Sequence, residues 1–416
     1  MKKNGLVRDN IIFFAATMML NMIGFFYHAY MGRVLGPAAY GVLGVTQTLL
    51  YLLNVILNVI QTAVARFVSR YKAKNDMASV RYLFRHGLSY LLWWGVLSFG
   101  LFLLLGFYLV DFLHISFRIY FFLGLVVPFV YLLALSRGVL QGLQSFIGLG
   151  MNNVTEGLFK LILGVVFVFV GFGVGGAVLG VSFSYIGAFL FSLIPLRSFF
   201  KQSQTKVERK DVIGYSWPVL FALLALTALY SFDVLFVKHY LTERDAGLYA
   251  AASLIGKIVF FATLSIAMVM FPKVSEWYDR KSAANVKRVL NTSLFFIVIM
   301  FFGIFVFYLL FPEFIILTLF GKNFLDIKSI LWLFALVYGL FSLIYSLSMY
   351  NLSIHRYRFI LGVVLMNVVE VMLLVLYHDT LKMVLTVVLG VLALLFVYLL
   401  WYTYTYRLEE NMDRAG

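Results

Sequence analysis

Five ionisable side chains stand inside long apolar stretches of the sequence, away from the ends of those stretches. The first two, Glu156 and Lys160, are one helical turn apart. The other three, Asp233, Lys257 and Glu370, are separated from one another. A charge inside a lipid bilayer is costly, so each of these residues is by default a candidate for binding an ion or a substrate. A lysine can hold a phosphate as a point charge, and a carboxylate can take up a cation or a proton.

Each of these candidates also has a plainer interpretation. Glu156 and Lys160 can neutralise each other across one helical turn. Asp233 can pair with Lys257 instead of binding a cation, and Glu370 has no evident partner in the sequence. We therefore predict Asp233, Glu156 and Glu370 as ion-coupling residues, and we predict Lys160 and Lys257 as phosphate-binding residues.

Uncharged polar residues follow narrow faces of the same apolar stretches. Five of them between residues 47 and 61 fall within about 80° of one another at 100° per residue. Polar groups that faced lipid would have no partners, so these faces must meet protein or water. A wet cleft between two halves of the chain explains them, and hydrogen bonds between helices are the alternative. The predicted substrate-binding residues are Asn21, His28, Arg33, Gln47, Tyr51, Asn54, Asn58, Gln61, Lys160 and Lys257.

Arg33 lies in a short polar turn with small residues, Gly32 to Gly41, between the first two apolar stretches. It can bind an anionic lipid head group or the substrate phosphate, or it can simply anchor the turn at the membrane interface. The turn and the basic segment that ends the second stretch describe a helical hairpin through a membrane.

Motifs of soluble catalysis are absent from the sequence. There is no G-x-x-x-x-G-K-[ST] phosphate loop, the histidines form no H-E-x-x-H, and the connecting loops are short. The chain has no cysteine, which excludes disulfides and thiolate metal sites. We therefore expect no enzyme activity, no metal centre and no cofactor beyond possible coupling to Na⁺ or H⁺.

The composition requires these residues to be positioned by membrane-spanning helices. The chain has 416 residues, of which 63% are hydrophobic and only 12% are charged, whereas soluble domains carry about 25% charged residues. Apolar runs of about 20 residues, enough to cross a hydrocarbon core of about 30 Å, recur along the chain. The predicted spans are roughly 10–31, 42–64, 87–110, 119–136, 149–170, 175–196, 213–237, 247–271, 290–311, 329–350, 358–377 and 382–403.

The net charge of +15 comes from basic residues gathered in particular loops. With twelve spans, the loops on the side of both termini hold most of the lysines and arginines. Such loops stay in the cytoplasm. We therefore expect a multi-pass protein of the cytoplasmic membrane with both termini inside, and no nucleic-acid partner.

The longest polar connection, RSFFKQSQTKVERKD at 197–211, divides the chain into two halves. Sliding the sequence by 206 residues aligns Gly41 with Gly247 and Ser69 with Ser275, which favours a parallel repeat of two six-helix units. Two unrelated bundles are the alternative. We predict an N-terminal lobe at 1–200, a cytoplasmic linker at 201–212, a C-terminal lobe at 213–404 and a cytoplasmic tail at 405–416.

Several segments, taken in order, resemble the Wzx-type polysaccharide flippases of the multidrug/oligosaccharidyl-lipid/polysaccharide (MOP) exporter superfamily. The segments are RVLGPAAYG (33–41), AVARFVSRYKAKND (63–76), RGVLQGLQSF (137–146), DVLFVKHYLTERDAGLYAAA (233–252) and FPKVSEWYD (271–279). The resemblance implies an all-α polytopic membrane protein with two six-helix lobes in the MATE-like V shape, around a central and often cationic cavity. The count of twelve spans separates the chain from the lipid II flippases, which usually have fourteen.

The resemblance also implies a function. We expect a flippase that carries polyprenyl (or dolichyl) phosphate-linked oligosaccharide across the membrane by alternating access, for surface polysaccharide or glycan assembly. A cation-coupled MATE-type multidrug exporter is the first alternative, and a non-transporting scaffold for glycan-assembly enzymes is the second. Expected partners are lipid-linked oligosaccharide, membrane lipids, and glycosyltransferases or a polymerase or ligase of the same pathway.

Overall fold

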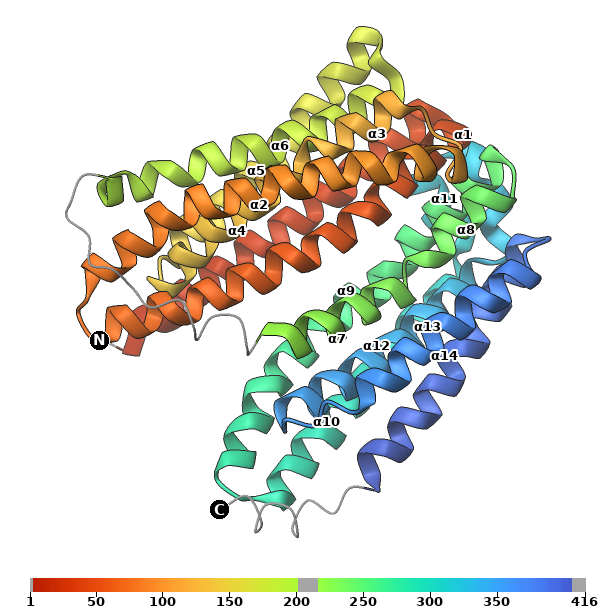
Figure 1. The fold of residues 1–416 in the computed structure, drawn as a ribbon. Coiled ribbons are helices and arrows are strands. Elements are labelled where there is room, and N and C mark those ends of the chain that lie inside the picture. Colours follow the sequence, from red (N-terminus) through yellow and green to blue (C-terminus); the bar gives the residue numbers. More distant parts are fainter. Residues whose placement is uncertain (1–2, 201–215, 406–416) are drawn as a thin grey trace. The chain divides into compact units, whose positions relative to one another are not determined.

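The computed structural model describes residues 3–200 and 216–405, with side chains from 15 to 200 and from 219 to 405. Every regular element in these ranges is helical, which confirms the predicted all-α class. The chain divides into two compact units, Met1–Leu220 and Phe221–Gly416, and each unit is described by itself (Figure 1). The predicted linker at 201–212 lies outside the described residues.

The N-terminal unit is built from long apolar helices that pack side by side. The central helix α1 contacts α4 and α5, and α5 runs along α6. Close packing comes from small residues, because a Cβ on Gly138 or Gly142 of α4 would lie within 2.6 Å of Val64 or within 2.5 Å of Val68 on α1. The helices are α1 (Lys3–Ala73), α2 (Met77–Phe112), α3 (Phe117–Gly124), α4 (Val126–Gly142), α5 (Phe146–Phe167) and α6 (Gly173–Leu196).

Helix α1 is a hairpin with a break at one glycine. Gly36 has φ 72° and ψ 172°, a left-handed conformation that glycine adopts without strain, and Pro37 begins the second arm. The hydroxyl of Tyr40 lies 3.3 Å from Nδ1 of His28. In one straight helix, residues this far apart in sequence would be about 18 Å apart. The sequence predicts a turn over residues 32–41. In the structure, the helix is interrupted only at Gly36.

The connection from α5 to α6 breaks in the same manner, through the π-helical turn Val168–Phe172 and left-handed glycines at 171 and 173. Gly180 of α6 then packs directly on α5, because a Cβ there would lie 2.4 Å from the Cα of Gly164. Gly176 is packed almost as closely, because a Cβ there would lie 2.8 Å from the backbone carbonyl carbon of Phe167.

Polar residues just before several helices fix where the helices begin. Asp76 accepts the backbone N–H and the hydroxyl of Ser79 at the start of α2, and these bonds hold the pKa of Asp76 below its ordinary value. Ser116, Thr242 and Thr380 accept backbone N–H groups in the same way before α3, α9 and α14.

The C-terminal unit is arranged around α12, the most buried of the apolar helices described. Helix α12 contacts α9, α10 and α14, and α13 packs on α14. The helices are α7 (Ser216–Leu229), α8 (Phe232–Tyr240), α9 (Glu243–Asp279), α10 (Ala283–Leu310), α11 (Pro312–Leu319), α12 (Leu331–Ser353), α13 (Phe359–Leu376) and α14 (Leu381–Tyr404).

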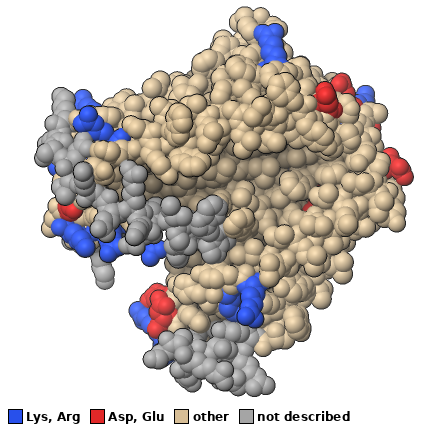
Figure 2. All heavy atoms as spheres, viewed as in Figure 1, with Lys and Arg blue, Asp and Glu red and all other residues tan. Residues whose placement is uncertain are grey.

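Nine helices in the described ranges are long and apolar enough to cross a membrane, or ten if α7 and α8, bent by 40°, count as one broken span. Two of the nine are 59 and 55 residues long, about twice or more what one crossing needs, and these contain the breaks at Gly36 and Gly171. The count of twelve crossings therefore stays a prediction. On the face in Figure 2 most of the surface is uncharged, and the lysine, arginine, aspartate and glutamate atoms that can be seen lie mainly toward its edges.

Candidate functional site

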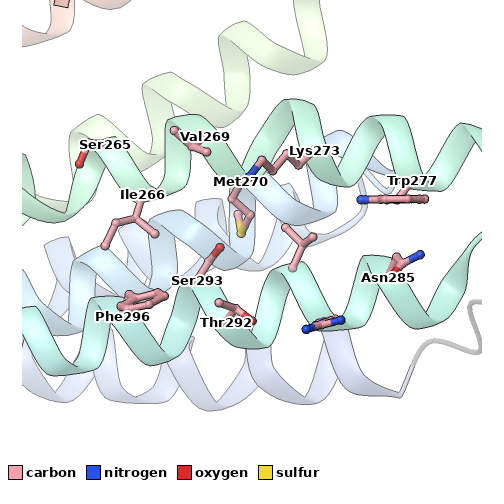
Figure 3. Close-up of a pocket in the computed structure, with 12 residues that line it drawn as sticks. Ser265, Ile266, Val269, Met270, Lys273, Trp277, Asn285, Thr292, Ser293 and Phe296 are labelled. Atoms are coloured by element: carbon pink, nitrogen blue, oxygen red, sulfur yellow. The ribbon is translucent and has the colours of Figure 1, made fainter.

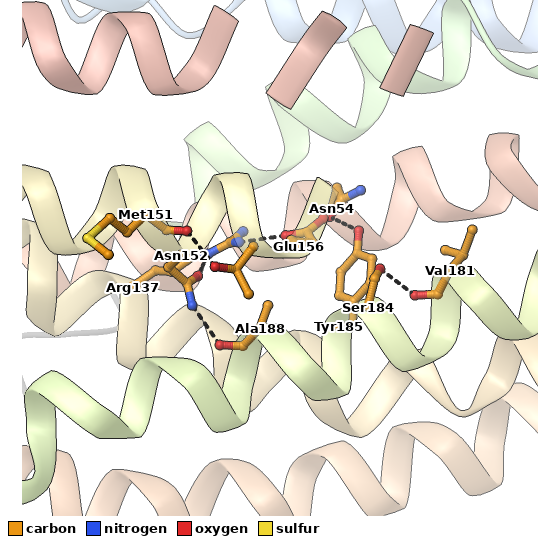
Figure 4. A network of polar contacts seen from close by, with 10 residues as sticks. Asn54, Arg137, Met151, Asn152, Glu156, Val181, Ser184, Tyr185 and Ala188 are labelled. Carbon is orange, nitrogen blue, oxygen red and sulfur yellow. Dashed lines mark hydrogen bonds and ion pairs between the residues drawn. The ribbon is translucent and has the colours of Figure 1, made fainter. Parts of the chain in front are cut away.

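A buried ion pair connects three helices of the N-terminal unit. Arg137 of α4 pairs through its guanidinium with the Glu156 carboxylate at 2.5 Å, and its Nε donates to Oδ1 of Asn152 at 2.7 Å. The amide of Asn152 donates to the backbone oxygen of Ala188 on α6 at 2.6 Å. Figure 4 shows these groups in one network inside the helix bundle. Arg137 is 7% exposed and Asn152 is fully buried.

This network bears on two expectations from the sequence. The predicted span 119–136 leaves Arg137 in the following loop, but α4 continues to Gly142, so the side chain lies within the helix. Glu156 forms an ion pair with Arg137, and the two alternatives for Glu156, coupling to an ion or neutralising Lys160, stay predictions. The buried guanidinium compensates its charge, which makes Glu156 the least available of the three predicted carboxylates.

Lys160 lies against the first arm of α1. Its Nζ is 4.7 Å from the centre of the Tyr27 ring, a cation–π contact, and 3.9 Å from where a Cβ on Gly24 would be. The residue is half-buried. The predicted phosphate ligand is therefore held beside α1 with its amino group over an aromatic face.

Several of the predicted substrate-binding residues contact neighbouring helices or the other arm of α1. Gln61 donates to Gln141 of α4 at 2.8 Å, and Asn54 accepts the hydroxyl of Tyr185 on α6 at 2.8 Å. His28 is buried against Tyr40, as described above. For these residues the alternative of hydrogen bonds between helices applies.

Other predicted substrate-binding residues lie at the surface of the unit. Asn21, Arg33 and Asn58 are exposed, and Gln47 and Tyr51 are half-buried and close enough to hydrogen-bond to each other. The predicted substrate residues thus separate into a group that connects helices and a group that is open to the surroundings of the unit.

The C-terminal unit buries an acidic residue at a helix break. Asp233 stands in the first turn of α8, immediately after the 40° bend from α7, and is 1% exposed. One carboxylate oxygen accepts the N–H of Val234 at 2.8 Å, and the other accepts the hydroxyl of Tyr249 on α9 at 2.7 Å. Broken helices at ion sites are typical of membrane transporters.

A second carboxylate lies close to the first. Glu370 of α13 is fully buried, and in the described part of the chain neither of its oxygens has a hydrogen-bond partner. Glu370 and Lys257 both lie within electrostatic range of Asp233. Each unpaired charge in an apolar interior is costly, so the three groups form one coupled cluster.

Two further oxygens near the bend also have no partner among the described residues. Asn367, one turn before Glu370, donates its amide to the backbone of Ala225 on α7 at 3.0 Å and leaves its Oδ1 unsatisfied. The hydroxyl of Ser231, at the bend itself, is also unsatisfied. Oxygen atoms of this kind are the ligands that hard cations prefer.

Lys257 of α9 is 4% exposed. Its Nζ lies 5.3 Å from the Tyr230 ring centre and 5.9 Å from that of Tyr338, and Tyr338 shares a hydrogen bond of 2.7 Å with Ser253. Lys257 also lies within electrostatic range of Asp233, and a direct pair between the two side chains stays a prediction. Lys160 and Lys257 belong to different units, and each is described within its own.

Sequence reasoning missed the partners of these charges. Arg137, Asn152, Tyr249, Asn367 and Ser231 carried no signal of their own, since isolated polar residues are common in membrane helices. The weak available signal was the spacing of Asn367 and Glu370, which places both on one face of a helix. In the described ranges no three histidine, aspartate or glutamate side chains gather as metal ligands.

Comparison with known proteins gives matches along most of the chain. A family model described as "Polysaccharide biosynthesis protein" matches residues 6–277. An uncharacterized membrane protein of Methanocaldococcus jannaschii is 23% identical over 319 residues, which cover 71% of this chain and 75% of that protein. Stage V sporulation protein B of Bacillus subtilis is 23% identical over 327 residues, 71% of this chain and 62% of that protein.

The fold is also found among solved structures. An inward-facing multidrug resistance MATE family transporter of the MOP superfamily superposes with a TM-score of 0.77 at 15% sequence identity, covering 98% of this chain and 99% of that one. At 15% sequence identity, the similarity shows that the two proteins share a fold. It extends over both units and therefore includes the residues beyond 277 that the family model does not reach.

Proposed function

Because this chain belongs to the polysaccharide biosynthesis protein family and has the fold of MOP-superfamily transporters, we propose that it is a flippase for lipid-linked oligosaccharide. Its substrate is a polyprenyl or dolichyl phosphate carrying an oligosaccharide, moved across the cytoplasmic membrane by alternating access for surface polysaccharide or glycan assembly. The observation that carries this proposal is the family match over residues 6–277. Both termini are cytoplasmic in this proposal, as the loop charges favour.

The half-buried Lys160 is the phosphate ligand in this mechanism. Glu156, its nearest acid in sequence, is already paired with Arg137, so the positive charge of Lys160 is available to a substrate phosphate. The exposed amides of Asn21 and Asn58 suit sugar hydroxyls, because an amide both donates and accepts hydrogen bonds. The lipid tail stays in the bilayer, whereas the sugar crosses along the polar side chains.

The acidic cluster of the C-terminal unit is the coupling site in this mechanism. Asp233 and Glu370, if ionised, contribute two negative charges, and Lys257 contributes one positive charge. One monovalent cation or one proton would complete the neutralisation, and the unsatisfied oxygens of Glu370 are available to hold it. A cation bound in one conformation and released in the other shifts the equilibrium between them.

Transport in proteoliposomes tests the substrate assignment. The full chain would be reconstituted with a fluorescent polyprenyl-phosphate oligosaccharide, and protection from an external quencher would report translocation. We expect transfer above that of empty vesicles. Lys160→Gln should weaken the apparent substrate affinity about tenfold, which corresponds to about 1.4 kcal/mol for a lost hydrogen bond to a charged group.

Two controls accompany this assay. Lys160→Arg keeps the charge and should retain most of the activity. Lys287 is an exposed residue of α10, and the variant Lys287→Gln should behave as the wild type. Transfer no faster than in empty vesicles, with several sugar heads tried on the same carrier, would count against a flippase.

A cation-coupled MATE-type multidrug exporter is the second candidate. The specific observation in its favour is the fold match over 98% of the chain to a multidrug resistance MATE transporter. Efflux of cationic dyes from cells that express the chain, dependent on a sodium or proton gradient, would favour the exporter if lipid-linked sugar is not moved.

A further inference from the structure

A groove runs between α9 and α10, away from the residues discussed above. The two helices are neighbours joined by the short connection at 280–282. Between their halves nearest that connection lies a cavity of about 580 Å³, a size typical of small-molecule sites. Figure 3 shows Trp277 and Asn285 toward one end of this groove, and Ser265 and Phe296 toward the other.

The end of the groove near the connection is cationic. Lys273 of α9 and Arg288 of α10 both line it, and they stand at similar distances from the connection on two antiparallel helices. In the described part of the chain neither side chain forms an ion pair or a hydrogen bond. Nearby Arg280 is different, because it pairs with Glu276 at 2.7 Å. Two exposed and uncompensated cations facing one cavity are complementary to an anion.

The other end of the groove is apolar. Ile266 and Val269 of α9 and Phe296 of α10 line it, and about 10 Å separates Ile266 from Lys273 along the helix axis. Val269 is 56% exposed and Phe296 is 54% exposed. The apolar wall is therefore exposed on the surface of the C-terminal unit, along two helices that are long and apolar enough to cross a membrane.

The order of these features along the groove indicates which chemical class of ligand fits it. A free anion would use the cations and leave the apolar wall uncovered, and an uncharged lipid would leave the cations without a partner. Trp277 beside the cations is typical of the membrane–water interface. The ligand therefore has a negative head at the interface and a hydrocarbon chain that continues into the bilayer.

We propose that this groove binds an anionic phospholipid of the surrounding bilayer, with its phosphate between Lys273 and Arg288 and one acyl chain along Ile266, Val269 and Phe296. The site lies outside the acidic cluster and contains none of the residues assigned to transport. The proposal therefore stands independently of the substrate.

Native mass spectrometry of the full chain in detergent tests the proposal. The probes are phosphatidylglycerol, phosphatidylcholine and inorganic phosphate. The double variant Lys273→Gln/Arg288→Gln should bind phosphatidylglycerol about 25-fold more weakly, at about fivefold for each basic residue beside an anionic lipid. The matched control Lys281→Gln/Lys287→Gln removes the same charge from neighbouring residues outside the lining and should bind as the wild type does.

A second variant separates a lipid from a free anion. Val269→Trp fills the apolar end and leaves both cations in place, and it should also lose phosphatidylglycerol. If this variant binds phosphatidylglycerol normally while inorganic phosphate competes for the site, the groove holds a free anion and the proposal is wrong. Equal binding of phosphatidylcholine, or an equal loss in the control variant, would overturn it as well.

Discussion

Replacing Glu370 by glutamine removes one charge from the acidic cluster and keeps the shape of the side chain. Glu370 is fully buried, and its two oxygens have no partner among the described residues. With Asp233 and Glu370 ionised and Lys257 protonated, the cluster carries one excess negative charge. The substitution Glu370→Gln makes the cluster neutral without a bound cation.

The structure sets the size of the expected effect. Burying an unsatisfied polar group costs about 1–3 kcal/mol, and more if it is charged, so the variant should be more stable than the wild type when no coupling cation is present. Sodium at 100 times its dissociation constant should stabilise the wild type by about 2.7 kcal/mol. The variant has lost the excess charge and should gain almost nothing from sodium.

Thermal unfolding of the purified chain measures both effects. The midpoint is compared in sodium chloride and in choline chloride at equal ionic strength, and then at two pH values. If the proton is the coupling ion, the wild type is stabilised by acidification instead of sodium, because the folded state binds one more proton than the unfolded state. Glu276→Gln, which removes an exposed carboxylate on α9, is the control and should keep the wild-type response.

An unchanged response to both sodium and pH in Glu370→Gln would refute this reasoning. The stabilisation by sodium or by acid would then come from another part of the molecule, and the carboxylate of Glu370 would have only a structural role. Loss of coupled transport together with loss of the ion response is the outcome that the cluster predicts.

Three more predictions concern the same charges and the packing around them. Arg137→Gln leaves Glu156 without its partner and should destabilise the N-terminal unit by about 3–5 kcal/mol; thermal unfolding should show partial recovery when Glu156→Gln is added. Gly180→Ala inserts a Cβ 2.4 Å from the backbone of α5 and should lower the free energy of unfolding by about 1–3 kcal/mol. The control Gly100→Ala, whose Cβ would have no atom within 4 Å, should be neutral. Equal losses of stability in the two variants would contradict the packing argument. Lys257→Met leaves two carboxylates uncompensated, so its unfolding midpoint should depend on sodium or acid more steeply than that of the wild type, and a flatter dependence would exclude the lysine from the cluster.

The sequence predicted well those features that depend on residues close together in the chain. The apolar stretches indicated the helical class, and the short polar turn of small residues at 32–41 indicated the first hairpin, which the structure places at Gly36. Two glycines four residues apart, Gly176 and Gly180, are typical of close helix packing. The five intramembrane charges were visible at once, because a charge in an apolar run stands out whatever its partner.

The break between α7 and α8 was not predicted. Neither residue at the bend, Tyr230 and Ser231, is a glycine or a proline, and the apolar pattern continues through them. Near the bend, the amide of Asn367 on α13 donates to the backbone oxygen of Ala225 on α7, a contact between residues far apart in the sequence. A local pattern cannot show a helix end that distant residues stabilise.

The sequence by itself determined that this chain is a polytopic helical membrane protein, and which of its intramembrane residues are charged. Only the tertiary structure decided which charges meet. Glu156 and Lys160 are neighbours on one helix, yet Glu156 pairs with Arg137 of another helix, and Asp233, Lys257 and Glu370 gather from three helices. The physical reason is that hydropathy and spacing act within one segment, whereas the pairing of buried charges depends on how separate helices pack.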